Sequence, residues 1–135
     1  HTGDYATFDA EGYFYFKGRK DDLINSSGYR IGPSEIENTI LSIDAVEMVA
    51  VVGVPDDLRG QIIKAVIVPR NKTYIDSQNP ELKDKIKNKV KNKLAAHEYP
   101  RIIEFVNELP LTTTGKIKRN IIRENHLRKI NERKI

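Results

Sequence analysis

Two continuous apolar runs occupy the middle of the chain, at residues 46–54 and 62–68. Both are rich in β-branched side chains and lack regular alternation with polar residues, which is typical of strands covered on both faces or nearly so. The intervening segment from Pro55 to Gly60, PDDLRG, predicts a loop. A shorter apolar run at residues 101–106 predicts a final strand.

Apolar positions with helical spacing flank these runs. Gly32-Pro33 is a helix start signal, and the isoleucines that follow fall on one helical face. Asn79 can cap a second helix with Pro80 in its first turn, and this helix carries an apolar stripe that repeats every four residues. The basic, partly amphipathic tail from Arg119 onward predicts a third helix. The apolar positions of the first two helices are Ile36, Ile40 and Ile43, and Leu82, Ile86, Val90 and Leu94.

Turn residues divide the beginning of the chain into short strands. The segment YATFDAEGYFYFKGR, residues 5–19, predicts a β-hairpin around a turn in which Gly12 can take a positive φ. Two short apolar pieces follow, on either side of the turn residues 25–28. The order of elements predicts an α+β fold: an N-terminal β-hairpin followed by a small three-stranded sheet flanked by helices.

Length and composition limit the classes of protein to consider. The 135 residues suffice for one domain, and 39% apolar with 31% charged residues argues against wholesale disorder. The absence of cysteine excludes disulfides and thiolate metal sites. No apolar run approaches the ~20 residues of a membrane span, and the beginning of the chain lacks the features of a secretory signal, so we expect a cytoplasmic location. The net charge of +4 suits nucleic acids and phosphorylated small molecules equally.

One segment carries candidate chemistry. PLTTTGKIKR, residues 110–119, resembles a phosphate-binding loop, but Pro110 replaces the first glycine and Ile117 replaces the hydroxyl residue that binds magnesium. What remains is Lys116, a compact charge on a long stem in a Thr/Gly loop, suited to phosphate or carboxylate oxygens. Taken alone, it could equally be an ordinary surface lysine.

Four segments in order resemble the C-terminal motifs of the adenylate-forming, or AMP-binding, superfamily: HTGD, GRKDDLINSSGYRIGPSEIE, GVPDDLRGQIIKA and EYPRIIEFVNELPLTTTGKIKR. This superfamily comprises acyl- and aryl-CoA synthetases, nonribosomal-peptide adenylation domains and beetle luciferases. The chain looks most like medium-chain acyl-CoA synthetases, with acetyl-CoA synthetases close behind. Such enzymes join a carboxylate to ATP, giving acyl-AMP and pyrophosphate, and CoA then displaces AMP. The resemblance implies that this chain is the C-terminal lid domain, which turns between the two steps.

The resemblance also implies roles for single residues. Asp4 would hold the ribose hydroxyls of the adenylate, and Arg19 would contact nucleotide hydroxyl or phosphate oxygens. Gly28 and Arg30 match the loop that faces the active site during thioester formation, where a missing side chain leaves room for pantetheine. Lys91 lies where related synthetases place a basic contact for CoA. Each position also has a structural explanation, as a turn former or a surface charge.

Two further positions concern the motion and the first chemical step. Asp21 matches the hinge, which divides the chain into a hinge-proximal segment with the hairpin, residues 1–20, and the lid domain proper, residues 21–135. Lys116 matches the catalytic lysine of adenylation, which reaches the carboxylate and the α-phosphate. The remainder of the active site would lie in a large N-terminal domain of the same enzyme. The isolated chain is therefore expected to have no substantial ligase activity.

The expected ligands follow from the same resemblance. The intact enzyme would use a carboxylic acid, ATP, CoA and Mg²⁺, with no ligand tightly bound to the isolated domain. The three histidines, His1, His97 and His126, are too scattered for a metal cluster, and we expect no metal site.

Two alternatives remain. One keeps the fold but serves a carrier-protein adenylation domain or an acid:AMP ligase without CoA. The other is a stand-alone basic module that contacts nucleic acid through residues 81–93 and 116–134. The aromatic residues of the predicted hairpin are far in sequence from these basic segments, which lack the interleaved pattern of a stacking platform. We therefore expect no nucleic-acid partner.

Overall fold

The computed structural model describes residues 22–134, without the side chains of Ala96 and residues 131–134. The hairpin predicted for residues 5–19 and the sites predicted at Asp4, Arg19 and Asp21 lie outside this range. The described elements are β1 (Ile24–Ser26), β2 (Tyr29–Ile31), α1 (Pro33–Leu41), β3 (Val46–Asp56), β4 (Gly60–Pro69), α2 (Thr73–Ser77), α3 (Pro80–Lys93), the 3-10 turn η2 (Ala96–Glu98), β5 (Ile102–Phe105) and α4 (Arg119–Lys134).

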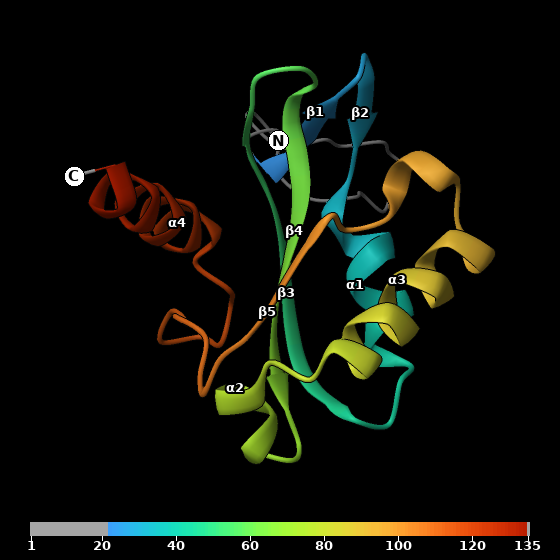
Figure 1. The fold of residues 1–135 in the computed structure, drawn as a ribbon, viewed down its shortest axis with the longest axis vertical. Coiled ribbons are helices and arrows are strands. Elements are labelled where there is room, and N and C mark those ends of the chain that lie inside the picture. Colours follow the sequence, from blue (N-terminus) through green and yellow to red (C-terminus); the bar gives the residue numbers. More distant parts are fainter. Residues whose placement is uncertain (1–21, 135) are drawn as a thin grey trace.

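A mixed sheet forms the centre of the molecule, with β4 as its middle strand (Figure 1). β3 runs antiparallel along the length of β4, and β5 pairs with β4 in parallel from Lys64↔Ile102 to Ile67↔Phe105. The β1–β2 hairpin joins the sheet through the single pair Ser26↔Gly60. The three strands predicted from the apolar runs are therefore present, and the β1–β2 hairpin extends the sheet to five strands.

The β3–β4 connection is tighter than the predicted loop. The strands continue to the pair Asp56↔Gly60, and Gly60 adopts φ +83°. The carboxylate of Asp56 accepts hydrogen bonds from the N–H groups of Leu58 and Arg59, at 3.1 and 2.9 Å. Pro55, Asp56 and Gly60, which were predicted to belong to a loop, are therefore part of the paired strands.

Helices α1 and α3 cover one face of the sheet (Figure 1). The stripe predicted for α3 is buried at Leu82, Ile86 and Val90, while Leu94 follows as the helix C-cap and is only partly buried. The side chain of Asn79 caps this helix by accepting a hydrogen bond from the N–H of Leu82. These residues join isoleucines of α1 and inward-facing residues of β3, β4 and β5 in the larger of two apolar cores.

Helix α4 packs on the opposite face (Figure 1). Alternate residues of β3 point there, and Ile122 of α4 meets them together with Leu109 from the segment after β5. Burial on both faces explains why the apolar runs of β3 and β4 do not alternate. The α+β prediction is confirmed, and its helices lie on both faces of the sheet.

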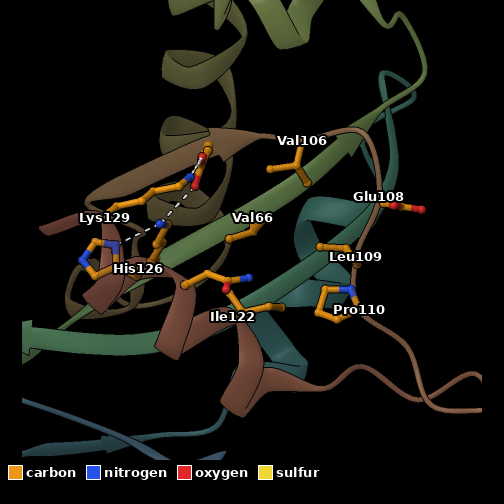
Figure 2. A pocket seen from close by; sticks show the side chains of 11 residues that line it. Val66, Val106, Glu108, Leu109, Pro110, Ile122, His126 and Lys129 are labelled. Atoms are coloured by element: carbon orange, nitrogen blue, oxygen red, sulfur yellow. Dashed lines mark hydrogen bonds and ion pairs between the residues drawn. The ribbon is translucent and has the colours of Figure 1, made fainter. Parts of the chain in front are cut away.

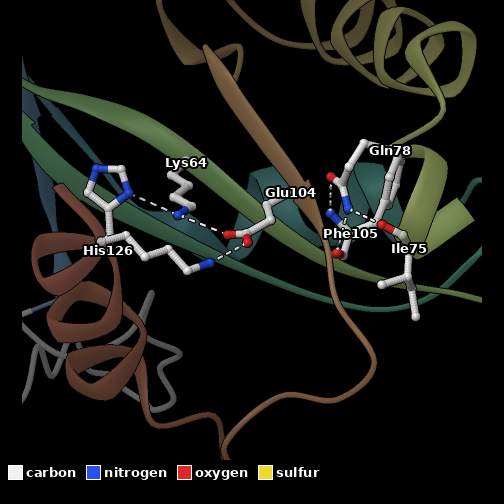
Figure 3. A network of polar contacts seen from close by, with 7 residues as sticks. Lys64, Ile75, Gln78, Glu104, Phe105 and His126 are labelled. Carbon is white, nitrogen blue, oxygen red and sulfur yellow. Dashed lines mark hydrogen bonds and ion pairs between the residues drawn. The ribbon is translucent and has the colours of Figure 1, made fainter. Parts of the chain in front are cut away.

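Two short elements differ from the sequence prediction, which left α2 and η2 as irregular chain. Gln78 explains the position of α2, because it ends this helix with φ +51° and also binds β5. Its side-chain amide accepts a hydrogen bond from the N–H of Phe105 and donates one to the carbonyl of the same residue (Figure 3). A side-chain amide thus provides two backbone-like hydrogen bonds to β5. Tertiary contacts of this kind leave no periodic signal in the sequence.

Candidate functional site

Lys116 lies on an exposed turn with a well-defined backbone. The N–H of Thr112 donates to the carbonyl of Lys116 at 2.8 Å, and the N–H of Lys116 donates to the Thr112 hydroxyl at 3.0 Å. A bridge between Leu111 and Ile117 closes the base, and Gly115 takes φ +90° at the tip. We call residues 110–118 the lysine loop. It holds the backbone of Lys116 in one geometry while the side chain remains in solvent.

Gly28 and Arg30 belong to the β1–β2 hairpin. Ser27 and Gly28 have φ +52° and +85°, the positive pair of a tight hairpin turn, and a Cβ added at Gly28 would meet no atom of residues 22–134 within 4 Å. Among these residues, Gly28 is therefore required by backbone conformation and not by packing. Between it and the exposed Arg30, the ring of Tyr29 stacks on His97 of η2, with centroids 3.8 Å apart and ring planes 8° apart.

Lys91 lies at the end of α3 close to the same region. Its ammonium is 4.3 Å from the ring centroid of Tyr99, and the guanidinium of Arg101 lies 5.0 Å from that ring. Because η2 connects α3 to Tyr99 and stacks on the β1–β2 hairpin, Lys91, Gly28 and Arg30 occupy one side of the domain. This side presents cations and stacked aromatic rings to solvent.

The lysine loop lies away from this side. In Figure 1 the lysine loop, drawn in orange between β5 and α4, is below α4, whereas the β1–β2 hairpin and η2 project from the other end of the sheet. The residues predicted for one enzyme therefore form two separate groups within the described chain. One group contains Lys116, and the other contains Gly28, Arg30 and Lys91.

A buried ionic cluster lies at the base of the lysine loop, where α4 begins. Nη2 of Arg119 is 2.7 Å from both carboxylate oxygens of Glu37, and Nη1 is 3.4 Å from the carboxylate of Asp22. Glu37 also accepts the N–H of Val51 in β3 at 2.8 Å. This cluster was not predicted from the sequence, although Glu37 directly follows Ile36 and is a charged residue among the buried residues of α1.

A second ionic cluster connects α4 to the sheet. The buried ammonium of Lys64 lies 3.1 Å from Glu104 of β5 and 2.9 Å from Nδ1 of His126, and Lys129 binds the other Glu104 oxygen (Figure 3). Burial by itself raises the pKa of Glu104, but hydrogen bonds from Lys129 and Lys64 outweigh burial and hold this pKa below its usual value. The apolar run had been interpreted as strand alone, so the role of Lys64 within it was missed.

The second cluster lies at the rim of a small pocket between β4, α4 and the segment after β5 (Figure 2). Its volume is about 80 Å³, and Val66, Leu109 and Ile122 form part of its apolar wall. This volume is well below the ~300 Å³ at which ligand pockets usually begin. We therefore regard the pocket as part of the packing of α4.

No group of three or more metal-ligating side chains among residues 22–134 is arranged to hold a metal ion. No helix in that range is long and apolar enough to cross a membrane.

Comparison with known proteins agrees with the four motifs. Residues 35–116 match the family model "AMP-binding enzyme C-terminal domain". The chain is 51% identical over 124 residues to 4-hydroxybutyrate–CoA ligase 1 of Metallosphaera sedula, and 48% identical over 130 residues to the mitochondrial acyl-coenzyme A synthetase ACSM4 of Homo sapiens. These alignments cover 92% and 94% of this chain but 22% of each relative.

Solved structures give the same result. An acyl-CoA synthetase of Brucella canis superposes with a TM-score of 0.75 at 45% identity, covering 95% of this chain and 23% of the other. An anthranilate CoA ligase in complex with anthranoyl-AMP superposes with a TM-score of 0.78 at 39% identity, covering 92% and 23%. The chain spans about a fifth of the length of these relatives, and it belongs to the AMP-binding enzyme C-terminal domain family.

Proposed function

We propose that this chain is the mobile C-terminal domain of an ATP-dependent acyl-CoA synthetase. The parent enzyme would convert a carboxylic acid, ATP and CoA into acyl-CoA, AMP and pyrophosphate through acyl-AMP. Relatives at 51% and 48% identity bear the names of CoA ligases and acyl-CoA synthetases, which supports this reaction class. The large remainder of the parent would supply the acid pocket and most contacts to ATP.

The observation that carries the proposal is the separation of two exposed loops on one rigid sheet. The lysine loop presents Lys116, while the β1–β2 hairpin presents Gly28 and Arg30 on the side where Lys91 lies. A domain with two such faces can serve a two-step reaction by turning a different face to the active site in each step. Asp21, immediately before the described residues, is the proposed hinge.

Lys116 would act in the adenylation step. Negative charge develops around the α-phosphate as a carboxylate oxygen attacks, and a positioned ammonium stabilises that charge more than the ground state. The hydrogen bonds within the lysine loop support this role because they fix the backbone from which the flexible side chain extends. Lys116 would donate hydrogen bonds to carboxylate and α-phosphate oxygens.

The other face would serve thioester formation. The open space beside Gly28 suits the narrow pantetheine arm, and Arg30 and Lys91 suit the phosphates of CoA. Asp4 and Arg19 are proposed to bind the ribose and the hydroxyl or phosphate oxygens of the nucleotide. Mg²⁺ would arrive with the phosphates of ATP, since residues 22–134 gather no ligand set of their own.

The metabolic role and the compartment are narrower proposals. We propose fatty-acid activation in the cytoplasm. Several acyl-coenzyme A synthetase relatives are described as mitochondrial, so fractionation of cells that express the full-length parent is the direct test of the compartment.

The decisive test of function is Lys116→Ala in the full-length parent. Acid-dependent pyrophosphate exchange should fall by about 10² or more, the loss seen when one preorganised donor is removed. Synthetic acyl-AMP plus CoA should still give thioester at a near-normal rate. Lys118→Ala, two residues along the same loop, is the matched control and should leave both half-reactions intact. Equal loss of both half-reactions in a folded Lys116→Ala protein would contradict the step-specific role.

A further inference from the structure

Arg119 lies at the base of the lysine loop, and its guanidinium binds two carboxylates from other parts of the domain. Arg119 is the first residue of α4, directly after Lys118, whose N–H donates to the carbonyl of Pro110 to close the lysine loop. Its side chain pairs with Glu37 of α1 and with Asp22. Through the Val51 N–H, Glu37 connects the cluster to the centre of β3.

We propose that Arg119 is a positioning residue for Lys116, acting as a latch that fixes the lysine loop to the rigid core and joins it to Asp22. The proposal deepens the function proposed above and rests on it. Arg119 itself touches no substrate in this scheme. It acts by limiting the directions in which the loop, and therefore the Lys116 stem, can point.

The geometry of the loop favours such a latch. Hydrogen bonds between Thr112 and Lys116 fix the tip internally, but they do not fix the loop relative to the sheet. That orientation is set by apolar contacts of buried Leu109 and of Ile117, which packs against the smaller core, and by Arg119. Apolar contacts are non-directional, whereas the paired oxygens of Glu37 define both the position and the plane of the guanidinium.

The cluster is poorly suited to stabilising the fold, which favours a positioning role. The side chains of Arg119 and Glu37 are 17% and 11% exposed, and the Nε of Arg119 is buried with no hydrogen-bond partner among the described residues. A desolvated ion pair gains little over a well-packed apolar pair, and an unpaired buried N–H adds a further cost. Its value therefore lies in the orientation that it imposes.

The contact with Asp22 gives the latch a second consequence. Asp22 follows the proposed hinge residue Asp21 directly, and the same guanidinium that binds Glu37 also reaches Asp22. The chain just after the hinge is therefore bound to the base of the lysine loop. When the domain turns, Lys116 would move with the segment after the hinge as one body.

The test compares variants of the full-length parent. Arg119→Met removes the latch, and the double variant Arg119→Met/Glu37→Gln also removes the orphaned carboxylate charge while an amide oxygen can still accept the Val51 N–H. Arg128→Met, an exposed arginine on the same helix, is the matched control. Thermal unfolding identifies which variants remain folded, and the double variant keeps the test possible if Arg119→Met alone unfolds.

Two readouts separate positioning from folding. In the folded variant, acid-dependent pyrophosphate exchange should fall by about 10- to 100-fold, since a misplacement of ~1 Å can cost about 10² in rate. Thioester formation from acyl-AMP and CoA should change by less than about twofold, because Lys116 acts only in the first step. Arg119→Lys should restore little activity, since a point charge cannot reproduce the fork of an arginine.

Hydrogen exchange of the lysine loop provides the independent measurement. The amides of Thr112, Lys116 and Lys118 should exchange at least about tenfold faster in the double variant than in the Arg128→Met control. Unchanged amide exchange together with unchanged pyrophosphate exchange in a folded double variant would overturn the latch. If Lys116→Ala leaves pyrophosphate exchange normal, the proposed function fails, and amide exchange still decides whether Arg119 positions the loop.

Discussion

The ammonium of Lys64 lies 3.1 Å from the carboxylate of Glu104, although the Lys64 side chain is only 5% exposed. The cost of taking an ammonium group out of water is offset when an ionised partner lies beside it. Hydrogen bonds from Lys129 and Lys64 outweigh burial and lower the pKa of Glu104, so the carboxylate remains charged. This pair joins β4 to β5, and Lys129 extends the connection to α4.

We predict that the stability of the domain depends on Glu104 at acidic pH. A carboxyl group whose folded pKa lies below the ordinary 4.5 adds stability above that value, and the stability is lost as the pH falls through the folded pKa. Glu104→Gln should therefore lower the free energy of unfolding by about 1–3 kcal/mol near neutral pH, and this deficit should shrink at low pH. Urea unfolding across the pH range measures both effects.

Glu98 provides a control, because its pKa is shifted in the opposite direction from that of Glu104. Burial raises its pKa, and the charge of Glu35 and a hydrogen bond with Glu35 raise it further. A raised carboxyl pKa adds stability below 4.5 that is lost as the pH rises through the folded value. Relative to wild type, Glu98→Gln should thus become more stable as the pH increases. Parallel pH profiles for the two variants would contradict this assignment.

Paired substitutions at two glycines should separate the two half-reactions of the parent. Gly28 and Gly115 have φ of +85° and +90°, and in the described part of the chain no atom lies within 4 Å of a Cβ added at either position. Asparagine tolerates positive φ better than most residues, so Gly28→Asn and Gly115→Asn should both fold. We expect Gly28→Asn to lower thioester formation from acyl-AMP by at least about tenfold, because the side chain fills the space proposed for pantetheine.

Gly115→Asn is the matched control for the conformational penalty. It should leave thioester formation from acyl-AMP unchanged and affect only pyrophosphate exchange, since it lies beside Lys116. Rapid-quench measurement of each half-reaction distinguishes the two variants. The assignment of the β1–β2 hairpin to the CoA step would fail if Gly28→Asn formed thioester at the normal rate.

Gly53 should tolerate no side chain. A Cβ at this position would lie 2.9 Å from Cγ2 of Ile24 and 2.9 Å from Oε1 of Gln61. Ile24 is fully buried, and Gln61 Oε1 accepts the N–H of Asn25 at 2.7 Å, so neither moves without loss. Gly53→Ala should therefore destabilise the domain by about 1–3 kcal/mol. Leu58→Ala, in the exposed β3–β4 turn, should stay within about 0.5 kcal/mol, and equal effects would contradict this account.

The sequence predicted those parts of the fold that depend on local patterns. Ile86 and Val90 are one helical turn apart on an apolar stripe, and Asn79 supplies a cap, so α3 was predictable to within one residue. Lys116 and Gly28 could be proposed as site residues because each lies in a contiguous motif. Their separation on the two sides of the domain was not predictable from local patterns, since it depends on how β5 and the β1–β2 hairpin pair with β4.

The two ionic clusters were also not predicted, because their members are far apart in the sequence. Arg119 and Glu37 are 82 residues apart, and Lys64 and His126 are 62 apart. No periodicity connects such positions, and a lysine within a β-branched run does not disturb the strand pattern. The sequence shows only that a charged residue occupies a position expected to be buried, which is unusual. The partner of that residue could be identified only from the three-dimensional structure.

The two cores on opposite faces of the sheet have a consequence for local unfolding. The face covered by α1 and α3 holds the larger core, whereas α4 rests on a smaller one and is held partly by ion pairs at Glu104 and Arg119. Such a small attachment should open well before the whole domain unfolds. We therefore expect the helix that follows the lysine loop to detach while the β1–β2 hairpin remains folded, so that moderate heat impairs the proposed adenylation step before the proposed thioester step.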